Sequence, residues 1–258
     1  MRTPLSSTNP YGRNRYGFLW EVLQRRSAGL HLDYGAYDGA VLKRLLAARI
    51  IRQGIGVDVN AEVVAAAHAS LPAALTLTQI RKGEPLPFCD KCFDSVSVLD
   101  VIEHVVDQDF ILRECQRVLR PGGAMVVTVP GQHIFSFLDI GNFKFRFPRL
   151  HRWYYSRKYS PEAYRKRYIE CPDGLIGDID KVKSWHEHFS ETRLSGLLER
   201  SGLEHVEVDG CGLFNRPLEL IACALPDPLR RLVDRQIRWD EAFFARTHLF
   251  AVGVKPGS

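Results

Sequence analysis

Short apolar runs alternate with amphipathic stretches along most of this 258-residue chain. The apolar runs predict seven strands, at 30–35, 54–59, 75–80, 93–101, 124–130, 205–214 and 248–256. Apolar residues three and four positions apart predict helices between them, at 40–49, 61–70, 108–120 and 191–202. Strands separated by helices indicate a parallel sheet covered on both faces, so we expect an α/β fold.

Local signals mark several helix ends. Ser190 precedes the helix 191–202 and can cap it, because a serine hydroxyl accepts from the unpaired N–H groups of a first turn. The sequence Pro-Gly-Gly at 121–123 follows the helix 108–120 as a stop signal. Ser160 and Pro161 predict the start of a further short helix at 160–170.

Two segments interrupt the alternation of strands and helices. The segment 132–185 is aromatic and basic and has no clear strand period, so we interpret it as an insertion after the fifth strand. The segment 216–247 is interpreted as a second, mostly helical insertion before the last strand.

Positive charge is concentrated in the first insertion. Residues 141–170 hold nine Lys or Arg against two Glu, whereas the whole chain has a net charge of +5, so the remainder is slightly acidic. Nine aromatic residues alternate with these cations: Phe143, Phe145, Phe147, Trp153, Tyr154, Tyr155, Tyr159, Tyr164 and Tyr168. The patch is a small footprint for duplex nucleic acid but suits an anionic, partly apolar molecule.

The composition is that of an ordinary globular protein, with 45% apolar and 25% charged residues. No apolar run approaches the roughly 18–20 residues of a membrane span, and the N-terminus has no secretory h-region, so we expect a cytoplasmic protein. The six cysteines are irregularly spaced. Cys89 and Cys92 form a lone C-x-x-C motif, for which zinc would need two further ligands.

Polar residues follow three of the predicted strands. Asp33–Gly39, Asp58 and Asp100–His104 each lie at or just past a strand end. Ligands of open parallel sheets bind at the carboxyl ends of the strands, where the strand order reverses. We therefore expect these residues around one crevice.

The turn at 35–40 does not suit a dinucleotide. The fingerprint G-x-G-x-x-G would place its glycines at Gly35, 37 and 40, but the chain has Tyr37 and Ala40. A tyrosine at the second position should block the approach of a pyrophosphate. The chain also contains no G-x-x-x-x-G-K-[ST] phosphate-binding loop. The ligand therefore need not be a phosphate.

Five motifs in order resemble the class I S-adenosylmethionine-dependent methyltransferase family. They are LDYGAYDG at 32–39, GVDV at 56–59, LPF at 86–88, IEHV at 102–105 and LRPGG at 119–123. The resemblance implies a Rossmann-like, seven-stranded, mostly parallel sheet with helices on both faces and the aromatic, basic insertion after the fifth strand. It implies S-adenosylmethionine as the cofactor, with contacts from Asp33, Gly35, Tyr37, Gly39, Asp58, Val59, Leu86 and Asp100.

The resemblance also implies a single domain over residues 1–258. Within it, we expect 1–27 to form an N-terminal cap, 28–131 the cofactor-binding core, and 132–185 a substrate-binding lid. Residues 186–258 would complete the sheet, interrupted by the helical insertion at 216–247.

The implied cofactor contacts have structural alternatives. Asp58 would accept hydrogen bonds from the ribose hydroxyls, or instead cap the following helix. Asp33 would orient the amino group of the cofactor, directly or through water, or instead act as a turn carboxylate. Gly35 and Gly39 would let the turn pass close to the ligand.

Two positions depart from the family pattern. Tyr37 replaces the middle glycine of the turn, where it would pack against the cofactor or alter its binding. Lys82 stands near the place where many relatives carry an aspartate for the adenine amino group. Backbone groups or Glu84 would have to replace that contact.

Methyl transfer is an in-line displacement, and a hydroxyl acceptor benefits from a base. The candidate catalytic residues are Glu103, His104, His186 and His188, with His104 favoured because it follows the fourth strand. We predict no metal. As an alternative, Asp100, Glu103 and His104 would share one face of a helical turn and could hold a divalent ion.

We predict an enzyme that O-methylates a hydroxyl of a small-molecule, sugar or lipid-linked acceptor, anionic or glycosidic, with peripheral membrane contact as an option. An RNA methyltransferase is one alternative, since cations with aromatics also bind single strands. A non-catalytic binding module of the same fold is another. The sequence leaves open the acceptor, the methylated atom and the oligomeric state.

Overall fold

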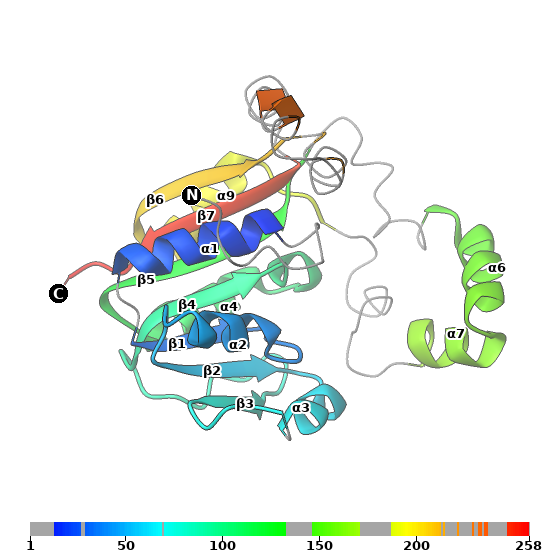
Figure 1. Cartoon of the computed structure of the whole chain (residues 1–258), viewed down its shortest axis with the longest axis horizontal. Coiled ribbons are helices and arrows are strands. Elements are labelled where there is room, and N and C mark those ends of the chain that lie inside the picture. The colour runs from blue at the N-terminus through cyan, green and yellow to red at the C-terminus, as the bar shows by residue number, and fades with distance from the viewer. Residues whose placement is uncertain are drawn as a thin grey trace.

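Seven strands form one sheet in the order β3-β2-β1-β4-β5-β7-β6 (Figure 1). The computed structural model describes residues 13–26, 29–68, 70–132, 146–170, 187–212, 214 and 247–257, with isolated positions between 221 and 236. The strands are β1 (Leu30–Tyr34), β2 (Gln53–Asp58), β3 (Leu75–Gln79), β4 (Phe93–Leu99), β5 (Leu119–Pro130), β6 (Glu204–Cys211) and β7 (His248–Val254).

The sheet is mostly parallel, as predicted. Strands β1 to β5 pair in parallel, and β7 runs antiparallel to both β5 and β6. The strand order reverses between β1 and β4, which lie side by side at the centre. This is the position at which open α/β sheets bind ligands.

Helices cover both faces of the sheet (Figure 1). The apolar residues of α1 (Arg13–Arg26), α2 (Ala40–Ala47) and α3 (Ala61–His68) form one buried cluster on the first face. Those of α4 (Gln108–Val118) and α9 (Glu191–Arg200) form a second cluster on the opposite face. In α1 the contacts come from Leu19, Trp20 and Leu23. The N-terminal helix therefore packs on the first face of the sheet and contributes to its hydrophobic core.

The alternation of side chains along the strands sorts residues between the two faces. Leu32 of β1 and Val96 and Val98 of β4 pack in the cluster that contains α4. Their sequence neighbours therefore point to the face covered by α1, α2 and α3. At the centre of the sheet these neighbours are polar: His31, Asp33, Ser95 and Ser97.

Two of the predicted helix caps are confirmed. The Ser190 hydroxyl accepts from Arg193 N at 3.2 Å at the start of α9. The Ser160 hydroxyl accepts from Ala163 N at 3.0 Å at the start of α7 (Pro161–Tyr168).

The predicted stop signal at 121–123 was wrong in its position. Helix α4 ends at Val118, and β5 begins at Leu119, so the Pro-Gly-Gly sequence lies within the strand. Leu119 pairs with Phe93, and the pairing then shifts register before Ala124 meets Ser95. The extra residues form an irregularity in which Gly122 adopts a φ of 75°. The turn-forming residues therefore belong to an irregularity within the strand and not to a helix terminus.

The first insertion leaves and rejoins the sheet at one point. Gln132 N donates to the carbonyl of Phe189 at 2.8 Å, and Phe189 N donates to the carbonyl of Pro130 at 2.9 Å. Gly131 and Phe189 form an isolated parallel bridge. We call this contact between 130–132 and 189 the neck. It lies just beyond the carboxyl end of β5 and anchors both ends of the intervening chain.

Two helices of the insertion pack against each other. Helix α6 (Pro148–Lys158) was not predicted, whereas α7 confirms the predicted short helix. His151 is buried between them, with its Nδ1 atom 3.1 Å from the hydroxyl of Tyr164. The rings of Tyr155 and Tyr168 also contact His151. The second insertion, 216–247, lies largely outside the described residues.

Candidate functional site

Carboxylates lie at the ends of the three strands around the switch point. Asp33 is in β1, Asp58 ends β2, and Asp100 follows β4. Because the three strands are parallel neighbours, their carboxyl ends lie along one edge of the sheet. The three carboxylates therefore lie at the same edge of the sheet, and the crevice expected around them stays a prediction.

The turn between β1 and α2 has an unusual backbone. Gly35, Tyr37 and Gly39 adopt φ values of 81°, 50° and 71°, in the left-handed region. A Cβ atom on Gly35 would lie 2.4 Å from Cγ2 of Val101, so packing as well as conformation requires glycine there. Tyr37 is 55% exposed, so its ring extends outward and does not fill the turn.

Asp58 fixes the position of that turn. Its Oδ2 atom accepts from Tyr37 N at 2.9 Å, and its Oδ1 atom accepts from Asn60 N at 3.0 Å. The cap of α3 comes from Asn60, whose Oδ1 accepts from Glu62 N at 3.0 Å and Val63 N at 3.2 Å. The alternative role of Asp58 as the helix cap is therefore filled by another residue. Each carboxylate oxygen can accept more than one hydrogen bond, so capacity for a ligand remains.

A row of buried hydrogen bonds runs across the strand pair β1–β4 and ends at Asp33. His31 Nδ1 lies 2.8 Å from Ser95 Oγ, and His31 Nε2 lies 2.9 Å from Ser97 Oγ. The Ser97 hydroxyl donates to Asp33 Oδ1 at 2.6 Å. We call these four residues the polar row. All of them are at most 2% exposed.

The polar row sets the tautomer of His31. Since the Ser97 proton is given to Asp33, His31 Nε2 must donate to the Ser97 oxygen. Burial lowers the pKa of His31 from 6.5 to about 3, so the imidazole is neutral near pH 7. In the neutral ring only one nitrogen carries a proton, so Nδ1 accepts from the Ser95 hydroxyl. The sequence analysis did not select His31, although a histidine inside an apolar strand was a signal.

Asp100 does not lie on a helical turn with Glu103 and His104, so the shared helical face predicted for them was wrong. Its φ is 55°, and the following 3₁₀ helix contains Ile102–His104. Its Oδ1 atom accepts from the Thr128 hydroxyl at 2.7 Å and lies 2.7 Å from His248 Nε2. Among the described residues, no group of three or more His, Cys, Asp or Glu side chains could hold a metal ion.

The candidate bases lie on two segments that one glutamine joins. His104 has 31% of its side chain exposed and its Nε2 is 3.9 Å from an oxygen of buried Glu103. Gln108 Nε2 donates to the carbonyl of Ile102 and to Glu187 Oε2, both at 2.9 Å. Glu187 adjoins the half-buried His188, so the segment of His104 and that of His188 meet at Gln108. His186 lies outside the described residues.

Glu187 was missed by the sequence analysis. It is buried, and its Oε1 atom pairs with Arg193 of α9. The Arg193 guanidinium also lies over the ring of Phe189, at 4.8 Å from its centre, and donates to Gln108 Oε1 at 3.2 Å. These contacts fix the neck against α4 and α9.

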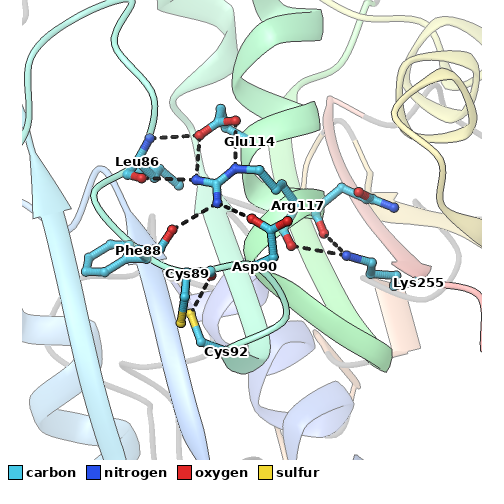
Figure 2. Close-up of polar contacts among 9 residues, drawn as sticks. Leu86, Phe88, Cys89, Asp90, Cys92, Glu114, Arg117 and Lys255 are labelled. Atoms are coloured by element: carbon cyan, nitrogen blue, oxygen red, sulfur yellow. Dashed lines mark hydrogen bonds and ion pairs between the residues drawn. The ribbon is translucent and has the colours of Figure 1, made fainter.

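The predicted cofactor contact Leu86 belongs to a loop that is clamped on α4 (Figure 2). Leu86 N donates to Glu114 Oε2 at 2.8 Å, and its carbonyl accepts from Arg117 at 3.0 Å. Arg117 also donates to the carbonyl of Phe88 and to Asp90. The Leu86 side chain is buried in the core. As a cofactor contact, Leu86 remains a prediction, as does half-buried Val59.

The Arg117 clamp shifts the pKa of its partner. Hydrogen bonds from Arg117 are the largest cause that holds the pKa of the Glu114 carboxyl below its usual value. Cys89 and Cys92 lie in the same loop, and the Cys92 thiol donates to the carbonyl of Cys89 at 2.9 Å. Burial and the neighbouring Cys89 raise the pKa of Cys92 to about 11, so it is a thiol near neutral pH.

Comparison with known proteins agrees with this geometry. A family model described as a methyltransferase domain matches residues 32–127. A Mycolicibacterium smegmatis protein named a probable S-adenosylmethionine-dependent methyltransferase is 36% identical over 129 residues, 49% of this chain and 48% of that protein. A ubiquinone biosynthesis O-methyltransferase of Azorhizobium caulinodans is 31% identical over 147 residues, 52% of this chain and 56% of that protein.

The fold comparison reaches further along the chain. The crystal structure of the YcgJ protein of Bacillus subtilis has a TM-score of 0.57 and 17% identity, and covers 95% of this chain and 99% of that one. The chain spans about half the length of the curated relatives it matches. The motifs, the sheet order and these matches together support a relationship of residues 32–127 to the class I S-adenosylmethionine-dependent methyltransferase family.

The described residues suit the family's cofactor, S-adenosylmethionine. It carries hydroxyls, an ammonium and a sulfonium but no phosphate, and the strand ends present carboxylates from Asp33, Asp58 and Asp100. Carboxylates accept from hydroxyls and attract cations, and they would repel a phosphate.

Among the described helices, none combines the length and apolar character that crossing a bilayer requires.

Proposed function

We propose that this chain transfers the methyl group of S-adenosylmethionine to a hydroxyl of a small-molecule, sugar or lipid-linked acceptor. The observation that carries the proposal is the acidic edge formed by Asp33, Asp58 and Asp100 at the switch point of the sheet. The cofactor would supply an activated methyl on a sulfonium. The residues of the chain would bind and orient the cofactor and the acceptor, and would remove the proton of the acceptor hydroxyl.

Asp58 would hold the ribose of the cofactor. Its two oxygens are already oriented by the N–H groups of Tyr37 and Asn60, so the carboxylate is fixed before a ligand arrives. A preorganised acceptor loses less conformational entropy when it binds. The same contact holds the turn at Tyr37, which would place Gly35 and Gly39 beside the ligand.

Asp33 would orient the amino group of the cofactor, directly or through water. Ser97 donates to one of its oxygens, so the orientation of the carboxylate is fixed. A charge-assisted hydrogen bond from the ammonium would then be directional. Asp100 would complete the acidic edge, with its orientation set by Thr128 and His248.

His104 is the residue we propose as general base, with Glu103 beside it. The His104 side chain is partly exposed, and a carboxylate oxygen of Glu103 lies 3.9 Å from its Nε2 atom. A neighbouring carboxylate stabilises the imidazolium that forms when the base takes a proton. His188 and His186 are the further candidates, and the insertion would select the acceptor. A ubiquinone biosynthesis O-methyltransferase among the relatives favours a hydroxyl acceptor, while the C-methyltransferases among them make a carbon acceptor the alternative.

Calorimetric titration with S-adenosylmethionine tests the proposal. The wild-type chain should bind, and Asp58→Ala should lower the affinity at least roughly tenfold, because one charge-assisted hydrogen bond is worth about 1.5–3 kcal/mol. Glu199→Ala, an exposed carboxylate on α9, is the matched control and should bind as the wild type does. Absence of binding by the wild-type protein would instead support a non-catalytic module.

A further inference from the structure

Helix α6 carries an exposed apolar strip. Leu150, Trp153 and Tyr154 are 50%, 53% and 46% exposed. They are spaced three and four residues apart, so they share one face of the helix. Side chains of this size and type are usually buried in a globular protein or covered by a partner.

The internal contacts of the insertion use a different face of the same helix. His151 and Tyr155 turn toward α7, where they meet the rings of Tyr164 and Tyr168. Packing of α6 on α7 therefore leaves the strip outside. Figure 1 shows the two helices side by side and set apart from the sheet.

Cations border the strip. Arg149, Arg157 and Lys158 are exposed, and α6 contains no acidic residue. Arg149 precedes Trp153 by one helical turn and Lys158 follows Tyr154 by one, so these two cations lie on opposite sides of the strip. The Arg157 guanidinium lies 4.8 Å from the centre of the Trp153 ring, at the C-terminal end of the strip. The face is thus apolar in its middle, with positive charge on its two sides and at one end.

We propose that this face of α6 docks on the surface of a bilayer that contains anionic lipid. Interfacial helices combine Trp, Leu or Phe on one side with Lys and Arg that attract anionic headgroups. An indole and a tyrosine ring also suit the boundary between headgroups and acyl chains. The partner is therefore identified by charge complementarity together with an apolar middle.

Single-stranded nucleic acid fits the same face less well. Bases stack on aromatic rings between cations, which Trp153 and Tyr154 could provide. Leu150 cannot stack and would remain exposed to water in such a complex, whereas a bilayer would bury it. The docking proposal concerns the insertion alone and does not depend on methyl transfer.

Vesicle flotation tests the proposal with the full-length chain. The wild-type protein should float with vesicles of phosphatidylcholine and phosphatidylglycerol, and much less with phosphatidylcholine alone. Raising the ionic strength from about 0.1 M to about 1 M should weaken the association, because the Debye length falls from about 10 Å to about 3 Å. Equal binding to both vesicle types would overturn the proposal.

Two variants locate the contact on α6. The double variant Arg149→Ala/Lys158→Ala should lose on the order of 25-fold in vesicle partitioning, roughly fivefold for each basic residue near an anionic surface. The matched control Arg113→Ala/Arg26→Ala removes two exposed cations from α4 and α1 and should bind vesicles as the wild type does. A loss of the same size in the control would show general charge attraction and overturn the proposal.

The apolar part of the face needs its own variant. Leu150→Ser/Trp153→Ser should lose roughly a hundredfold or more on anionic vesicles, because a bilayer would bury both apolar side chains. These side chains are exposed, so the thermal unfolding of the variant should stay close to wild type. Unchanged flotation, or tighter binding of a single-stranded oligonucleotide that both double variants abolish, would overturn the bilayer proposal.

Discussion

The Ser97 hydroxyl donates to Asp33 across 2.6 Å inside the sheet, where both residues are almost completely buried. The two residues are register partners on β1 and β4, so the pairing of the strands creates the contact. A carboxylate that is 2% exposed thus has its orientation set by a serine that never reaches the surface. If Asp33 orients the amino group of the cofactor as proposed, the loss of this contact should affect binding of the amino-acid tail and not of the nucleoside.

Ser97→Ala should weaken the affinity for S-adenosylhomocysteine about tenfold. The variant removes a hydrogen bond to a charged acceptor, worth about 1.5–3 kcal/mol, and weakens the constraint on the orientation of the Asp33 carboxylate. Methylthioadenosine has the same nucleoside but lacks the amino-acid tail, so its affinity should stay within about twofold of wild type. Calorimetric titration with both ligands gives the comparison.

Ser95→Ala is the matched control for that experiment. Ser95 contacts His31 at the far end of the polar row and not Asp33. It should change the affinity for S-adenosylhomocysteine much less than Ser97→Ala does. An equal loss of affinity for both ligands in Ser97→Ala would show general damage to the crevice rather than misplacement of Asp33.

His31 should make stability depend on pH between about 3 and 6.5. Its pKa is lowered in the folded protein, so below 6.5 the unfolded chain binds a proton that the folded one does not. The contribution of His31 to the free energy of unfolding is therefore fully present above pH 6.5 and is lost as pH falls toward 3. The loss should reach about 3–5 kcal/mol, measured by urea unfolding across that range.

His31→Gln isolates this contribution. The glutamine amide can still donate and accept within the polar row but does not titrate in this range. The free energy of unfolding of the variant should therefore vary less with pH than that of the wild type. His68→Gln, at an exposed histidine of α3, should keep the wild-type slope. Parallel curves for wild type and His31→Gln would contradict the assignment.

Glu114→Gln should loosen the loop at 86–92. The variant removes the charge that Arg117 and Leu86 N both engage, at a cost of about 1–3 kcal/mol. Because the pKa of Glu114 is lowered in the fold, its contribution is present above its ordinary value of 4.5 and disappears as pH falls through the lowered pKa. Urea unfolding at pH 7 and hydrogen exchange of the loop amides measure the effect.

Glu84→Gln serves as the control for the clamp. Glu84 forms an exposed ion pair with Arg81 at 3.5 Å, and such pairs contribute about 0–1 kcal/mol. Its substitution should leave the free energy of unfolding almost unchanged. A similar small loss in Glu114→Gln would mean that the loop does not depend on the Arg117 contacts.

His248→Phe should destabilise the end of β4. The substitution keeps an aromatic ring of similar size on β7 but removes the nitrogen that meets Asp100 Oδ1 at 2.7 Å. The expected loss in the free energy of unfolding is about 1–3 kcal/mol. His205→Phe, on β6, is the comparison variant and should cost much less, because His205 is exposed.

Local patterns were enough to predict the sheet and most of its helices. The strands at 30–35 and 54–59, and the caps Ser160 and Ser190, depend on residues close in sequence, and the structure has them nearly where expected. Helix α6 was not predicted because arginine, lysine and histidine alternate with its aromatic residues, which hides the apolar periodicity that a core helix shows. The early end of α4 depends on the pairing of Leu119 with Phe93, which no local pattern contains.

The site residues at strand ends could be predicted from the sequence, whereas the contacts that join different strands could not. Asp33, Asp58 and Asp100 follow from the rule that ligands bind at the carboxyl ends of parallel strands. The polar row depends on the register of β1 against β4, and the contact between Asp100 and His248 joins residues 148 positions apart. The left-handed φ of Asp100 likewise removed it from the helical turn that the spacing of the motif suggested.

The neck has a consequence for how the segment between its two ends can change in sequence. Among the described residues, Pro130, Gln132 and Phe189 join the two ends of the intervening segment with two backbone hydrogen bonds. Backbone hydrogen bonds do not depend on which side chains flank them. Substitutions within α6 and α7 should therefore leave the hydrogen bonds of Gln132 and Phe189 intact, so these two helices can change in sequence while the end of β5 keeps its geometry.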